Sequence, residues 1–231
     1  MFSVLFEVDP RSDRWDDYLN YAKMLRPELE NVDGFVDNIR YRSLNRDGWI
    51  LSLSNWRDEK ALVRWRTTAN HHEVQMKGRT EVLADYHLRV GQLTSDTTPP
   101  AGMALTEQRL DETGVGAGTT VTLLTAHSDH DWIAGRTPDE VASWLGLPAP
   151  THDLVGWELF EAVLEPGALV LMLTWRDAGA AREYIDHAAT PENSRLRTIR
   201  VIRDYGMRDR REAPQYYPPA QPGKVPAPIG S

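Results

Sequence analysis

The sequence of 231 residues contains no cysteine, which excludes disulfides and thiolate sites and gives no sign of an oxidising compartment. It also lacks a basic cluster. The formal net charge is −8 at pH 7, which argues against nucleic acid or an anionic membrane surface as the main partner. No apolar run is long enough to span a bilayer, and residues 1–9 enter a strand pattern without the basic start of a signal peptide. We therefore expect a cytoplasmic protein that binds neither nucleic acid nor membranes.

One segment of the sequence occurs twice. Residues 51–61 and 171–180 both run from an apolar strand into Trp-Arg-Asp and then a helix. The two tryptophans, Trp56 and Trp175, are 119 residues apart. The same offset relates Asp85-Tyr86 to Asp204-Tyr205, Arg89 to Arg208, Gly48 to Gly167, Ala69 to Ala188 and Val4-Leu5 to Leu123-Leu124. A constant offset across strands, turns and helices indicates a tandem duplication.

The periodicity of the first half predicts the order β-α-β-β-α-β. Strands are expected at 2–8, 35–43, 49–56 and 79–93, with helices beginning near Asp13 and Asp58. This order is the ferredoxin-like unit, in which two helices cover one face of an antiparallel sheet. The other face of the sheet needs a cover of its own.

The second half repeats this order in a shortened form. Its strands are expected at 119–126, 154–164, 168–175 and 197–208, with a short helical region at 138–145 and a helix from Asp177. We therefore predict an α+β protein of two tandem ferredoxin-like units, at 1–95 and 118–211. Residues 96–117 are expected to form a Pro/Gly-rich linker, and 212–231, with six prolines, an extended tail.

The first 93 residues resemble the antibiotic biosynthesis monooxygenase family. Members commonly show a strand ending in Trp-Arg-Asp, a second Trp, a His, a Gly-Arg pair and a late Asp-Tyr. The matching residues here are Trp56-Arg57-Asp58, Trp65, His71, Gly78-Arg79 and Asp85-Tyr86. The resemblance implies a dimeric α+β barrel, in which two ferredoxin-like units pack their open sheet faces together. Two copies could pair within this chain or across a homodimer, and the sequence leaves both open.

Two histidines are the strongest candidates for chemistry. His71 and His72 follow the helix of Trp65, and a histidine can act as a base near neutral pH or as an iron ligand. The alternative is a polar helix corner that faces water. His71 occupies the position of the family's histidine, whereas its counterpart in the second half is Thr190 and that of Trp65 is Tyr184. We therefore expect the active cavity in the first half, between its sheet and the Trp65 helix, with His71 at the rim.

Further side chains are expected to bind a substrate. The fourth strand places His87 opposite its apolar face, so His87 is expected to point into the barrel, on an inner face shared with Asn38, Ser52 and Ser54. Buried polar groups of this kind need partners, a water or a ligand. The complete set comprises Trp65, Asn38, Ser52, Ser54, Arg79 and His87. No carboxylate and histidine set has convincing metal spacing, so no metal site is expected.

The resemblance implies two kinds of chemistry. The first is a small oxygenase or tailoring enzyme acting on an aromatic or polyketide-like metabolite without a cofactor, with His71 as base and Arg79 or Asn38 as donors. The second is a haem protein with His71 or His72 as axial ligand. Haem-degrading members also use an Asn on the first strand, and residues 2–8 contain none. A third alternative is a non-catalytic ligand-binding domain.

Overall fold

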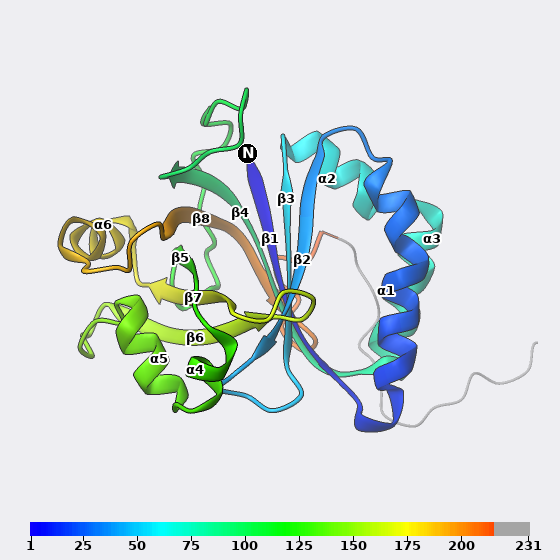
Figure 1. Cartoon of the computed structure of the whole chain (residues 1–231). Coiled ribbons are helices and arrows are strands. Elements are labelled where there is room, and N and C mark those ends of the chain that lie inside the picture. Colours follow the sequence, from blue (N-terminus) through cyan, green and yellow to red (C-terminus); the bar gives the residue numbers. More distant parts are fainter. Residues whose placement is uncertain (215–231) are drawn as a thin grey trace, which may run out of the picture.

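The computed structural model describes residues 1–214. In the first half, strands β1 (Phe2–Pro10), β2 (Phe35–Ser43), β3 (Ile50–Trp56) and β4 (Leu83–Asp96) form one sheet. Helix α1 (Trp15–Glu30) follows β1 after a short 3₁₀ turn, and helices α2 (Glu59–Arg66) and α3 (Ala69–Lys77) follow β3. All three helices lie on one face of this sheet (Figure 1). The predicted β-α-β-β-α-β order is confirmed.

The second half has the same order. Its strands are β5 (Thr120–His127), β6 (Leu154–Ala162), β7 (Ala168–Trp175) and β8 (Arg195–Gly206). The long helix α1 is replaced here by two short ones, α4 (His130–Ala134) and α5 (Pro138–Leu145), and α6 (Ala178–His187) follows β7. These helices lie on the opposite side of the molecule from α1–α3 (Figure 1).

The eight strands close into one barrel in the order β1-β3-β2-β6-β7-β5-β8-β4. The halves meet along two antiparallel pairs, β2 with β6 and β4 with β8. Inside the barrel lies an apolar core to which both halves contribute, for example Leu5, Leu53, Leu123 and Phe160. Each sheet thus covers the open face of the other, and the barrel is complete within a single chain.

Equivalent positions in the two halves show the duplication directly. Trp56 and Trp175 are the last residues of β3 and β7. The side chain of Asp58 accepts from the amide of Ala61 at the start of α2, and that of Asp177 accepts from two amides at the start of α6. Such caps stabilise a helix by about 1 kcal/mol each.

The duplication departs from the constant offset in the first strand of each half. Thr120, and not Val121, stands opposite Trp175 as Phe2 stands opposite Trp56. As a result Leu5 and Leu123 face the barrel core, while Leu124 packs against the helices. The predicted pairing of Val4-Leu5 with Leu123-Leu124 is therefore wrong by one residue.

The region before β4 also differs from the prediction. Residues 79–82 do not begin the fourth strand. They belong to a π-helical turn, Gly78–Val82, which continues from α3 and places Arg79 in the interior. Turns of this kind are rare and are frequently found at functional sites.

The segment between the halves lies against the barrel. The amide of Thr113 donates to the carbonyl of Val201 at 2.9 Å, and the side-chain oxygen of Gln92 accepts from two amides further back in the segment. The Glu212 carboxylate accepts from Thr113 Oγ1, Gly114 N and Asp204 N, each at 2.7 Å. Beyond Pro214, the predicted extended tail lies outside the described residues. No helix within residues 1–214 is long and apolar enough to cross a membrane.

Candidate active site

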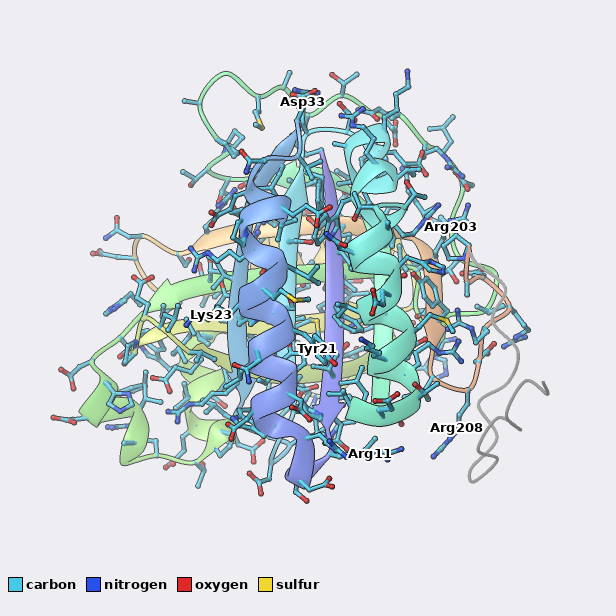
Figure 2. All side chains as sticks on the ribbon, turned by 90° about the vertical axis from the view of Figure 1, so that its right-hand side faces the viewer. Arg11, Tyr21, Lys23, Asp33, Arg203 and Arg208 are labelled. Atoms are coloured by element: carbon cyan, nitrogen blue, oxygen red, sulfur yellow. The ribbon has the colours of Figure 1, made fainter. Side chains whose placement is uncertain are left out.

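A cavity of about 240 Å³ lies in the first half, between the sheet and helices α1–α3. Figure 2 shows α1 and the α2–α3 pair side by side in front of the strands, with Tyr21 between them. The cavity lies on the helix-covered face of the sheet. The other face is the barrel interior, which the apolar core fills. Its walls are mainly aliphatic and aromatic, with contributions from Val4, Phe6, Leu25, Leu29, Leu62, Val74, Leu88 and Val90.

His71 and Trp65 form a stacked pair in this wall. Their ring centroids are 4.3 Å apart, with an angle of 19° between the planes. Only two residues separate α2 from α3, so the first turn of α3 folds back over the end of α2 and brings the rings together. His71 Nδ1 lies 3.1 Å from the Trp65 carbonyl oxygen. Because a carbonyl only accepts, this contact places the proton on Nδ1 and leaves the lone pair on Nε2.

The surroundings keep His71 uncharged. Burial lowers the pKa of its imidazole to about 4, although the hydrogen bond to Trp65 opposes this. Nε2 lies 3.4 Å from Gln75 Nε2, which can donate to it. Near neutral pH the cavity therefore presents a neutral imidazole with a basic nitrogen held in place by Trp65 and Gln75.

A polar strip crosses the floor of the cavity on β2 and β3. Asn38 Nδ2 donates to Ser52 Oγ at 2.9 Å, and Ser54 Oγ accepts from the indole nitrogen of Trp56 at 3.0 Å. Both serine oxygens accept, so their own O–H groups can be donated to a ligand. The prediction that these three residues point into the barrel is wrong, because Leu51 and Leu53 take that face and the strand period turns the serines toward the helices.

Four arginines line the same cavity: Arg40, Arg66, Arg79 and Arg210. The described lining contains no aspartate or glutamate. Of these arginines, the sequence singled out only Arg79. Arg66 directly follows Trp65, and this position next to a predicted site residue could have pointed to it. Arg210 follows β8 and reaches a first-half cavity that only the folded barrel brings near it.

His87 and His72 lie outside this cavity. His72 is exposed on α3. His87 does face the barrel side of β4, as predicted, at an end of the barrel where Nε2 lies 2.6 Å from Asp204 Oδ1 and Nδ1 3.5 Å from Glu7 Oε1. Burial disfavours its charge, but these two carboxylates outweigh burial and raise the pKa of His87 to about 9. Glu7 also binds Arg89 at 2.7 Å, so this cluster is a paired ion network rather than an open site.

The second half has a groove at the corresponding place. It encloses about 520 Å³ beside α5 and α6, and Trp175 and Tyr184 contribute to its wall. Its described lining includes Asp153, Glu183 and His187 but no arginine, and Thr190 replaces His71 in the repeat. The two halves thus differ in the charge of their cavities and in the position of the histidine.

The cavity is small for haem. Pockets that bury drug-sized ligands enclose roughly 300–1,000 Å³, whereas this cavity encloses about 240 Å³. Within residues 1–214 no cluster of three histidine or acidic side chains could hold a metal ion.

Comparison with known proteins identifies the family of this barrel protein. A family model for antibiotic biosynthesis monooxygenase matches residues 1–77. A curated relative from Pyricularia oryzae, named jasmonate monooxygenase, is 49% identical over 225 residues, which are 95% of this chain and 100% of the relative. The chain belongs to the antibiotic biosynthesis monooxygenase family and is a monooxygenase-like oxidoreductase with a small-molecule substrate.

Two solved structures are similar to this chain at low identity. A crystal structure of aldoxime dehydratase is 12% identical with a TM-score of 0.53, covering 87% of this chain and 80% of that one. A crystal structure of an antibiotic biosynthesis monooxygenase is 14% identical with a TM-score of 0.36, covering 43% of this chain and 100% of that one. At these identities the aldoxime dehydratase supports the barrel architecture alone.

Proposed function

We propose that this enzyme oxygenates a small, largely apolar metabolite in the first-half cavity without a bound cofactor. The observation that carries the proposal is the neutral His71 imidazole, stacked on Trp65 and facing an apolar cavity. The substrate classes that fit are jasmonate, which the Pyricularia relative is named for, and aromatic or polyketide-like compounds of secondary metabolism. All of these can place an acidic C–H or O–H beside the imidazole.

His71 is the proposed base. The substrate proton would move to Nε2, and the resulting enolate or phenolate would itself transfer electrons to dioxygen and form a carbon-bound hydroperoxide. Loss of water from this hydroperoxide would leave a carbonyl group, so that one oxygen atom enters the product and the other leaves as water. A pKa of about 4 makes the imidazole a weak base in the empty cavity. The transfer, however, creates an imidazolium beside an anion, and the attraction between these charges in a dry cavity offsets that weakness.

The polar strip has a proposed role beside His71. Asn38, Ser52 and Ser54 can donate hydrogen bonds to the oxygen on which negative charge develops. Trp65 supports the imidazole and offers a flat face to the ligand. His72 and His87 have no place in this scheme because neither lines the cavity.

The test is turnover of jasmonate under ¹⁸O₂ by the chelator-treated full chain, followed by mass spectrometry. We expect a product in which a CH₂ group has become a carbonyl that carries one ¹⁸O atom, with the second ¹⁸O released as water, formed without hemin and without an added reductant. A Soret band in the purified protein, or turnover only after hemin is added, would contradict the cofactor-free scheme. Jasmonate bound without any product would contradict oxygenation of this substrate.

A further inference from the structure

Three of the cavity arginines gather around two tyrosines at the β4–β8 side of the sheet. Arg210 NH1 donates to the Tyr86 hydroxyl, and its guanidinium lies 5.8 Å from the ring centroid of Tyr205. The positive charges of Arg79 and Arg210 both act on Tyr86, and those of Arg66 and Arg210 act on Tyr205. The three arginines come from α2, from the π-helical turn and from the segment after β8.

The described residues that line the cavity include no aspartate or glutamate. Asp85 is next to Tyr86 in the chain, but its Oδ1 accepts from the Tyr86 amide and Asp85 is not part of the cavity wall. Arg66 Nε is buried and has no hydrogen-bond partner among the described residues. Three arginines in the wall of an otherwise apolar cavity give this end a positive charge, which favours a negatively charged group on the ligand.

We propose that Arg66, Arg79 and Arg210, together with the Tyr86 and Tyr205 hydroxyls, bind a carboxylate on the substrate. This rests on the proposed function and deepens it, because it assigns the anionic end of the ligand to named residues. A planar carboxylate matches the paired N–H groups of a guanidinium, and each tyrosine hydroxyl can add a donor. The apolar body of the ligand is then left to the aliphatic and aromatic walls.

The experiment compares two probes that differ only in this group. Jasmonate carries the carboxylate, and methyl jasmonate has the same body without the charge. Binding to the full chain is measured by calorimetry at low and high salt. We expect the acid to bind more tightly than the ester, and Arg66→Gln or Arg210→Gln to weaken the acid about ten- to a hundredfold while leaving the ester unchanged.

Lys60→Gln is the matched control, because it removes one positive charge from the exposed side of the same helix α2. It should leave both affinities within about twofold. Retained ester binding shows that each arginine variant is folded. Equal affinity of the wild type for acid and ester, or an acid-to-ester ratio unchanged in both arginine variants, overturns the carboxylate site.

The outcomes separate this inference from the oxygenase proposal. Arginine-dependent binding of the acid without uptake of dioxygen supports the carboxylate site and contradicts oxygenation. Turnover of acid and ester at equal efficiency overturns the carboxylate site and leaves oxygenation standing.

Discussion

Two histidines of this protein differ in charge because of their neighbours. Burial in the cavity lowers the pKa of His71 to about 4, whereas Asp204 and Glu7 raise that of His87 to about 9. The sequence predicted the strand face of His87 correctly. It could not predict the ion network, because Asp204 is 117 residues away and meets His87 only when β4 pairs with β8.

The His87 network makes stability depend on pH. The folded pKa of about 9 lies above the usual value of about 6.5 for an unfolded chain, so the network stabilises the fold fully below pH 6.5. That stabilisation is lost as the pH rises through 9. His87→Gln should therefore lower the free energy of unfolding in urea at pH 6 and have a much smaller effect at pH 10. His152→Gln, at a site whose side chain is 85% exposed, serves as the control. An equal deficit at both pH values would show that the charge of His87 does not contribute.

At the scale of elements, the repeat predicted most of the architecture. The strand-to-helix corners at Trp56 and Trp175 and the four strands of each half follow from periodicity and a constant offset. The one-residue shift between β1 and β5 could not be predicted, because residues 120–124 are all buried and their burial does not alternate along the strand. Ser52 and Ser54 alternate with leucines along β3. This alternation separates the two faces of the strand but does not show which face meets the helices.

The glycines at the equivalent β2–β3 and β6–β7 hairpins provide a matched test of this architecture. Gly48 and Gly167 have φ of +78° and +93°, which favour glycine in both places. A Cβ on Gly48 would meet nothing closer than 3.7 Å, whereas one on Gly167 would lie 2.3 Å from the Ser128 carbonyl oxygen. Gly48→Ala should cost about 1–2 kcal/mol of unfolding free energy, and Gly167→Ala about 2–5 kcal/mol. Equal losses in urea unfolding would contradict the close packing at Gly167.

At the scale of the whole molecule, one chain makes the barrel and the first half holds the candidate site. The sequence left pairing within or between chains open, because the same open sheet faces could meet either way. The β2–β6 and β4–β8 pairs show that they meet within the chain. The second half does more than cover the first, since Tyr205, Arg210 and Pro214 complete the wall of the cavity.

The central claim is that chemistry takes place in the first-half cavity with His71 as its base. The most direct measurement compares turnover of jasmonate by His71→Ala and Thr190→Ala, which change equivalent positions of the two halves. We predict that His71→Ala lowers kcat by about a hundredfold or more, while Thr190→Ala, at an exposed site, retains the wild-type rate. Wild-type turnover by His71→Ala, or an equal loss in both variants, would contradict it.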